Sequence, residues 1–187
     1  MANRVPKPAS LGDYPEHAAF IGEIVAMWNL IEDETIGLMP IFTGIAQEQA
    51  DLFMGALPSS QAKLDMIHAA GKHMLKNGEK RKTLDSLFKS LSDRLKARNT
   101  YAHGVYAVNE KNQLCILRRK FQYPSDPKSI LVIYLHTLRN EVEHSTKLLR
   151  RVTQFYAQLW ADVPETLVKA LRRTWLLLGF HHLTNRE

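Results

Sequence analysis

The feature of this sequence that most constrains its fold is a set of long segments in which apolar residues recur every three or four positions. The most regular segment covers residues 79–102, where the repeat includes Leu84, Leu91 and Leu95. Similar repeats cover residues 17–39 and 130–160. Because a helix has 3.6 residues per turn, this spacing places the apolar side chains on one face. The sequence therefore predicts several amphipathic helices that bury one face each.

Proline, glycine and serine mark where these helices begin and end. Pro40 is expected to end or kink the first helix, because proline lacks the backbone N–H that a helix interior needs. Residues 58–60, Pro-Ser-Ser, supply a serine cap for a helix that residues 76–78 then interrupt. After Gly104, β-branched and aromatic residues surround the turn-forming residues 109–112, which predicts a short β-hairpin or an extended excursion.

These boundaries predict an all-α fold, an antiparallel helical bundle with a short β-hairpin or extended insertion after the helix 79–102. Residues 1–16 are rich in proline and are expected to form an N-terminal arm. Residues 17–187 are expected to form a single domain, with the insertion at about 105–128. The last helix of the bundle is expected after Pro164.

The composition limits the classes of function. A formal net charge of +6 over 187 residues suits an anionic partner such as RNA, DNA or a membrane surface. A single cysteine, Cys115, excludes an internal disulfide and a cysteine-based zinc site. No segment has the pattern of a signal peptide or of a membrane span, so we expect a cytoplasmic protein that does not insert into a membrane.

Two segments repeat the pattern Arg-Asn, three residues, His. One contains Arg139 and His144, among acidic and basic residues in the long predicted helix 130–160. Five residues of helix amount to about 500° of rotation, so these two side chains point about 140° apart. The neighbouring charges at three- and four-residue spacing are typical of a solvated helix face. This pair is predicted to have no chemical role.

The other segment contains Arg98 and His103, and its context differs. Arg98 occupies the apolar stripe of the helix 79–102, where a desolvated guanidinium needs an anionic or hydrogen-bonding partner. His103 falls at the helix end, and Gly104 is expected to leave the helix in a left-handed conformation. Arg98 and His103 can then converge, within one chain or across a dimer interface. The alternative is an interface arginine beside a capping histidine.

This arrangement resembles the HEPN superfamily, helical nucleotide-binding proteins whose signature is Arg, a polar residue, and a His four to six residues after the Arg. The matching residues are Arg98, Asn99 and His103. A first helix with Trp28 and Glu32 is similar too, and the resemblance covers residues 17–160. It implies an all-helical homodimer with both motif copies at the interface. It further implies a metal-independent endoribonuclease of bacterial stress or defence type, with an operon-encoded regulator or antitoxin as a second partner.

The chemistry of RNA cleavage is compatible with these residue types. RNA carries its own nucleophile, the 2′-hydroxyl, so cleavage needs proton transfer and charge neutralisation. His103 can exchange protons near neutral pH. Arg98 can hold the scissile phosphate bidentately, and Asn99 can orient the imidazole or the phosphate. The expected product is a 2′,3′-cyclic phosphate, with no metal and no cofactor.

Further residues are candidates for binding single-stranded RNA. Arg118, Arg119 and Lys120 can follow the phosphate backbone, and Tyr101 and Tyr106 offer rings for base stacking. The alternative is solvated surface charge beside core aromatics. Two other functions also stay open. One is a non-catalytic HEPN-like module that binds nucleotide, nucleic acid or protein, and the other is a helical adaptor whose Arg98 joins two subunits.

Overall fold

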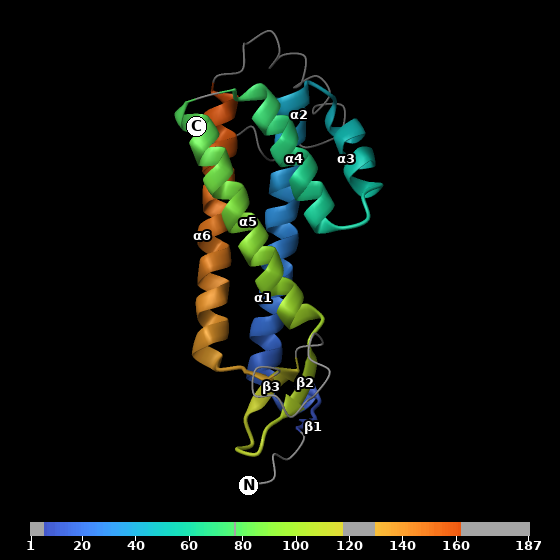
Figure 1. The fold of residues 1–187 in the computed structure, drawn as a ribbon, viewed down its shortest axis with the longest axis vertical. Helices are drawn as coiled ribbons and strands as arrows, with labels where there is room; N and C mark the ends of the chain where they lie inside the picture. Colours follow the sequence, from blue (N-terminus) through green and yellow to red (C-terminus); the bar gives the residue numbers. More distant parts are fainter. Residues whose placement is uncertain (1–5, 77, 118–129, 162–187) are drawn as a thin grey trace, which may run out of the picture. The chain divides into compact units, whose positions relative to one another are not determined.

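The computed structural model describes residues 6–76, 78–117 and 130–161. The described chain is mostly helical and carries a small antiparallel sheet, so the predicted mainly helical fold is confirmed (Figure 1). The chain divides into two compact units. Unit 1 contains residues 1–31 and 90–149, and unit 2 contains residues 32–89 and 150–187.

The helices and strands follow the apolar segments of the sequence closely. The helices are α1 (Pro15–Ile36), α2 (Leu38–Thr43), α3 (Gln47–Gly55), α4 (Ser60–Met74), α5 (Glu79–Ala102) and α6 (Leu135–Trp160). The strands are β1 (Lys7–Pro8), β2 (Val105–Val108), β3 (Leu114–Leu117) and β4 (Ile130–Val132). A short 3-10 turn, Leu11–Asp13, precedes α1.

Unit 1 consists of the sheet and the three helix segments that join it. The strands lie in the order β1-β2-β3-β4, and every neighbouring pair is antiparallel. In this unit α5 runs toward the sheet, whereas α1 and α6 run away from it (Figure 1). The core between helices and sheet is formed by Ile21, Ile24, Tyr101, Leu114, Ile116, Ile133 and Leu138. The end of α5 is therefore fixed directly against the sheet.

The sheet is larger than the sequence predicted. The expected hairpin is present as β2 and β3, but β4 pairs with β3 where the sequence suggested the start of the long helix. Ile130 and Val132 are β-branched and fit a pleated sheet, so the helix begins only at Leu135. In the expected N-terminal arm, Lys7 and Pro8 pair with β2. Both additions depend on partners distant in sequence.

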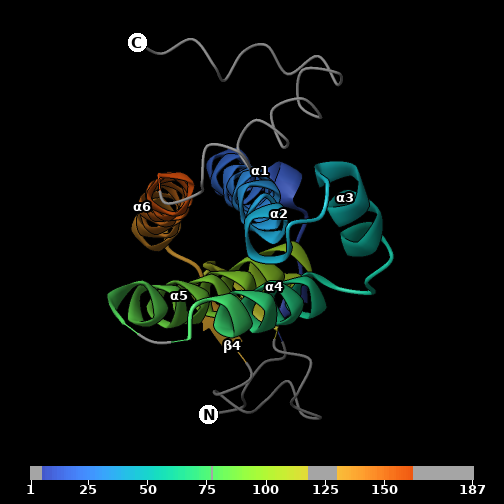
Figure 2. The ribbon, with the colours of Figure 1, turned by 90° about the horizontal axis from the view of Figure 1, so that it is seen from above.

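Unit 2 contains α2, α3, α4 and the adjoining parts of α1, α5 and α6. The serine cap predicted for α4 is confirmed, since the Ser59 side chain accepts a hydrogen bond from the backbone N–H of Ala62 at 3.2 Å. Helices α2 and α4 pack together at Gly71, where an added Cβ would lie 2.8 Å from the Phe42 ring. Helix α3 lies beside α2 (Figure 2).

The first helix ends earlier than Pro40. It stops at Ile36, and Pro40 lies in the first turn of α2, where backbone N–H groups have no intrahelical partner and proline is tolerated. Gly44, with φ of 74°, ends α2 in the left-handed conformation. The break predicted at Pro40 therefore belongs four residues upstream.

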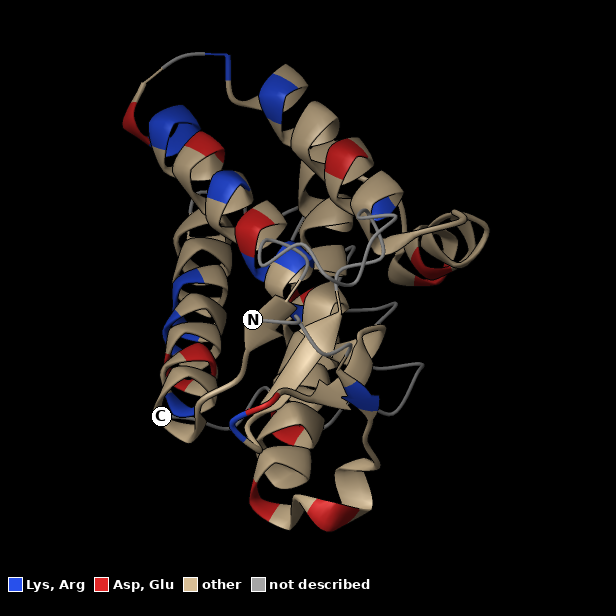
Figure 3. Cartoon of the chain, turned by 60° about the horizontal axis from the view of Figure 1, so that its bottom comes forward, with Lys and Arg blue, Asp and Glu red and all other residues tan. Residues whose placement is uncertain are grey.

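Charged residues alternate in sign along the exposed side of α5 (Figure 3). Lys82, Asp85, Lys89, Asp93 and Lys96 are all exposed. Such a pattern is typical of a solvated helix face. None of the helices in the described ranges is long and apolar enough to span a membrane.

Candidate functional site

Arg98 lies near the end of α5, on the stripe that packs into unit 1. Leu91 lies two turns earlier and Leu95 one turn earlier; both are buried, and Arg98 itself is half-buried. Its Nε atom is buried and has no hydrogen-bond partner among the residues that the structure describes. A buried donor without an acceptor costs free energy, so Arg98 is held in a position that packing alone does not favour.

The other two residues of the motif contact the same guanidinium. Arg98 Nη1 donates to Asn99 Oδ1 at 3.0 Å and to His103 Nε2 at 3.3 Å. Since a guanidinium only donates, Nε2 of His103 is the acceptor and the ring proton sits on Nδ1. Asn99 and His103 are both exposed. Arg98 and His103 thus converge within one chain, one of the two arrangements that the sequence allowed.

Gly104 has a different role from the one predicted. Its φ is not positive, so it does not leave the helix in the left-handed conformation. Instead, a Cβ at this position would lie 2.7 Å from the Thr100 carbonyl oxygen and 2.7 Å from Ile116 Cγ2. Glycine is needed because the end of α5 approaches β3 closely. This approach fixes the backbone of His103, the preceding residue.

Tyr101 belongs to the core and not to a binding surface. Its side chain is 6% exposed and packs among the core residues of unit 1, so the predicted stacking role does not fit this structure. Burial raises the pKa of its hydroxyl, and nearby Glu141 adds to the shift. Tyr106 is half-buried against the same core. Arg118, Arg119 and Lys120, the predicted contacts to an RNA backbone, lie outside the described residues.

Two contacts around the motif were not predicted from the sequence. The Tyr106 hydroxyl donates a hydrogen bond to the backbone carbonyl of Tyr101. Arg94, one turn before Arg98, forms a half-buried ion pair with Glu141 of α6. Local spacing in the sequence does not mark the second contact, because Glu141 follows Arg94 by 47 residues.

The second Arg-Asn motif lies on an exposed face, as predicted. Arg139 and His144 are both exposed on α6. The Arg139 guanidinium lies 5.8 Å from the centre of the Phe20 ring of α1. A cation over an aromatic face is a modest stabilising contact. The two side chains of this motif do not form a joint site.

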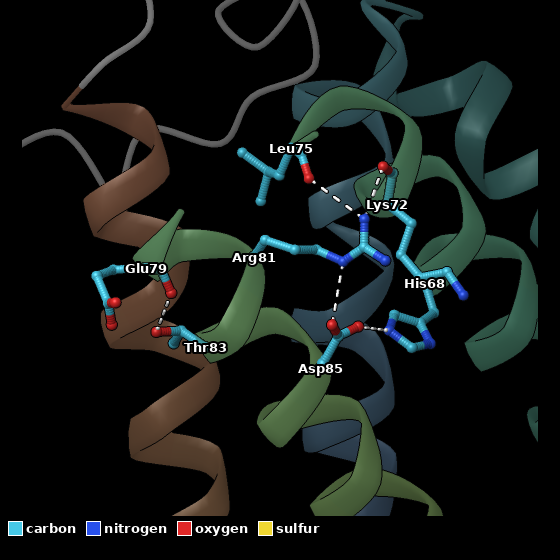
Figure 4. Close-up of polar contacts among 7 residues, drawn as sticks. All are labelled: His68, Lys72, Leu75, Glu79, Arg81, Thr83 and Asp85. Atoms are coloured by element: carbon cyan, nitrogen blue, oxygen red, sulfur yellow. Dashed lines mark hydrogen bonds and ion pairs between the residues drawn. The ribbon is translucent and has the colours of Figure 1, made fainter. Parts of the chain in front are cut away.

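Unit 2 contains a second cluster of titratable side chains, at the junction of α4 and α5 (Figure 4). Arg81 Nη1 donates to the carbonyls of Lys72 and Leu75 at 3.0 and 3.3 Å, which satisfies the end of α4. Arg81 Nε donates to Asp85 Oδ2 at 3.1 Å, and Asp85 Oδ1 lies 2.7 Å from His68 Nε2. The hydrogen bond from His68, together with Arg81, holds the pKa of the Asp85 carboxyl below its usual range.

This cluster has a structural explanation. The His68 ring stacks on Phe88 of α5 with ring centres 4.7 Å apart. The contact of His68 with Asp85 joins α4 to α5, and Arg81 caps the end of α4. The contact of Arg81 with Asp85 lies within α5 and holds both side chains in place. The cluster therefore ties two consecutive helices together. In the described ranges, no three His, Cys, Asp or Glu side chains gather around a position for a metal ion.

The cluster of Arg98, Asn99 and His103 is thus the candidate ligand-binding site within the described part of the chain. It combines a partly unsatisfied cation with an exposed imidazole. No protein-family model, no curated protein and no solved structure matches the chain, so the interpretation of this site depends on its own geometry.

Proposed function

We propose that this protein is a metal-independent endoribonuclease of HEPN type, with Arg98, Asn99 and His103 as its active site. The observation that supports this most is the contact of one guanidinium with both the Asn99 amide and the His103 imidazole. A cation for the phosphate and a base for the 2′-hydroxyl are the two groups that cleavage by RNA's own nucleophile requires.

The reaction follows from the roles of these groups. His103 Nε2 takes the proton of the 2′-hydroxyl, and the 2′-oxygen attacks the adjacent phosphorus. The bond from phosphorus to the 5′-oxygen breaks, and that oxygen takes a proton from water. The products are a 2′,3′-cyclic phosphate and a 5′-hydroxyl end, and His103 returns its proton to solvent. Arg98 stabilises the charge that grows on the phosphate oxygens.

Substrate binding activates His103 in this scheme. Without RNA, the Nε2 lone pair is occupied by Arg98 Nη1. A phosphate is a stronger acceptor for a guanidinium than a neutral imidazole, because the hydrogen bond is charge-assisted on both sides. Arg98 therefore turns to the phosphate, and Nε2 becomes available for the 2′-hydroxyl. Asn99 Oδ1, which also accepts a hydrogen bond from Arg98 Nη1, helps to orient the guanidinium during this exchange.

The remaining parts of the proposal concern partners. We propose single-stranded RNA as the substrate, with Arg118, Arg119 and Lys120 along its backbone. We also propose that the protein is a homodimer that brings two copies of the motif together, and that an operon-encoded regulator or antitoxin controls it. The formal net charge of +6 supports an anionic substrate.

The test is cleavage of a defined single-stranded RNA in the presence of EDTA. We expect His103→Ala to lose about 10²–10⁴-fold in rate, the usual contribution of one acid–base group. Arg98→Lys should also fail, because an ammonium keeps the charge without the bidentate geometry. Arg139→Ala and His144→Ala are matched controls from the second motif and should cleave as the wild type does.

One further result would support the mechanism, and another would refute it. An RNA with a single 2′-deoxy residue at the cleaved position should resist cleavage there and be cut elsewhere. Cleavage that survives in His103→Ala, or that requires a divalent metal, would refute the mechanism.

The second candidate function is binding without cleavage. It is favoured by the contact between Arg98 Nη1 and His103 Nε2, which occupies the imidazole lone pair that a general base needs. In that case wild-type protein binds the RNA and its fully 2′-deoxy form equally and cleaves neither. Arg98→Ala would then weaken binding of both.

A further inference from the structure

The chain around His103 is fixed at several points that the proposed reaction does not use. Gly104 contacts β3 so closely that a Cβ there would lie 2.7 Å from Ile116 Cγ2. Two residues before His103, the Tyr101 ring is buried in the core of unit 1. Three residues after it, Tyr106 reaches back to the Tyr101 carbonyl. His103 thus lies inside a short segment, residues 101–106, that is held at both ends.

Tyr106 is itself held in place from two directions. It lies opposite Ile116 in the pairing of β2 with β3. Its backbone carbonyl accepts a hydrogen bond from the N–H of Ala9 at 3.1 Å, next to β1. Its ring packs against the core of unit 1. The hydroxyl therefore starts from a rigid position in the sheet.

The acceptor of this hydrogen bond is a group that would otherwise lack a partner. Tyr101 lies in the last turn of α5, where backbone carbonyls have no intrahelical donor. The Tyr106 hydroxyl satisfies this carbonyl and so ties the last turn of α5 to strand β2. His103 follows directly, and its backbone N–H donates to the Asn99 carbonyl at 3.1 Å.

We propose that Tyr106 is a positioning residue, whose hydroxyl holds the end of α5 so that His103 Nε2 meets Arg98. This inference rests on the proposed function, because it assigns Tyr106 to the same site. It gives the tyrosine a role other than base stacking. Burial, with a contribution from Tyr101, raises the pKa of Tyr106 to about 12, so the hydroxyl stays protonated and keeps donating throughout the neutral range.

The test compares Tyr106→Phe with Tyr134→Phe. Both changes remove one hydroxyl from a tyrosine of unit 1, but Tyr134 is exposed, and its hydroxyl makes no hydrogen bond within the described residues. The first readout is the ¹⁵N NMR signal of the His103 ring in the free protein. We expect Tyr106→Phe to change the His103 Nε2 signal as the contact with Arg98 weakens, and Tyr134→Phe to leave it unchanged.

The second readout is RNA cleavage. A small misplacement of a catalytic group can cost up to about 100-fold in rate, so we expect Tyr106→Phe to lower kcat by about tenfold with little change in KM. A wild type that does not cleave RNA refutes the proposed function, and the NMR comparison then decides the positioning role alone. If the His103 signal is the same in Tyr106→Phe and the wild type, the positioning role is refuted, whatever the activity.

Loss of folding is controlled separately. Circular dichroism establishes that each variant is folded at the temperature of the NMR measurement. If Tyr106→Phe is unfolded there, the NMR comparison is repeated for all proteins at a lower temperature at which the variant is folded. Displacement of the His103 signal in a folded variant supports the proposal, and an unchanged signal overturns it.

Discussion

Replacing Gly104 by alanine tests whether the end of α5 is fixed by close packing. The new Cβ would lie 2.7 Å from both Thr100 O and Ile116 Cγ2, whereas ordinary contacts begin at 3.4 Å. Each of these contacts must therefore lengthen by about 0.7 Å, the difference between the two distances. The Thr100 oxygen belongs to the backbone of α5 and cannot rotate away, so the backbone between Thr100 and Gly104, which includes His103, must change its conformation.

The magnitude follows from the cost of overpacking. Extra atoms in a tightly packed site destabilise a protein by about 1–3 kcal/mol. For a chain of this size, 1 kcal/mol shifts the melting temperature by about 2–4 °C. We therefore expect Gly104→Ala to melt about 2–12 °C below the wild type, measured by circular dichroism. Any RNA cleavage should fall by about tenfold or more, because His103 moves.

Gly22→Ala is the matched control for this prediction. Gly22 lies within α1, and a Cβ there would meet nothing within 4 Å. Alanine is the better helix former, so this variant should be more stable than the wild type by about 0.5–1 kcal/mol. Opposite signs for the two glycines are the expected result. A Gly104→Ala protein as stable as the wild type would refute the argument from close packing.

Three further predictions concern two ion pairs and the oligomeric state. Asp85→Asn should destabilise the protein slightly at neutral pH. Because folding lowers the pKa of Asp85, the stabilisation by its carboxylate is present above the unfolded-state pKa near 3.8 and is lost as the pH falls through the lower folded-state pKa. Denaturant melts of wild type and variant should therefore converge in acid. Glu141→Gln should lower stability by about 1–3 kcal/mol in a urea melt, because Arg94 loses its half-buried charge partner, and an unchanged midpoint would contradict this. Light scattering at tens of micromolar should give the mass of a dimer, and a monomer would remove that part of the proposal.

Much of the helical fold could be predicted from local patterns. The bounds of α5 follow from its apolar repeat, because residues such as Leu84 and Leu95 bury one side of a regular helix. The beginning of α4 follows from the side-chain oxygen of Ser59, which can satisfy a free N–H of the first turn. Both signals act over a few residues, so they can be read without knowing the tertiary structure.

The sheet edges could not be predicted in the same way. Strand β1 contains only Lys7 and Pro8, and its pairing with β2 joins residues about 100 positions apart. Strand β4 lies in a run that also fits the start of a helix by its apolar spacing. Short strands carry little local signal, and their pairing is decided by the partner strand.

The contact between Arg98 and His103 could be predicted from the sequence, but the residues that fix their positions could not. The apolar stripe pointed to Arg98 as a desolvated cation, and the helix end pointed to His103. The predicted role of Gly104 is wrong, because a glycine needed for close approach and one needed for positive φ look alike in sequence. The burial of Tyr101 was also not evident, since an aromatic residue serves a core and a binding surface equally well.

The most direct test of the central claim is the chemical identity of the RNA ends. A defined single-stranded RNA is incubated with purified wild-type protein in EDTA, and the masses of the fragments are measured by mass spectrometry. The proposed mechanism predicts fragments that end in a 2′,3′-cyclic phosphate and begin with a 5′-hydroxyl, and it predicts that folded His103→Ala at the same concentration gives none. Fragments with 5′-phosphate ends, or the same fragments from His103→Ala, would contradict it.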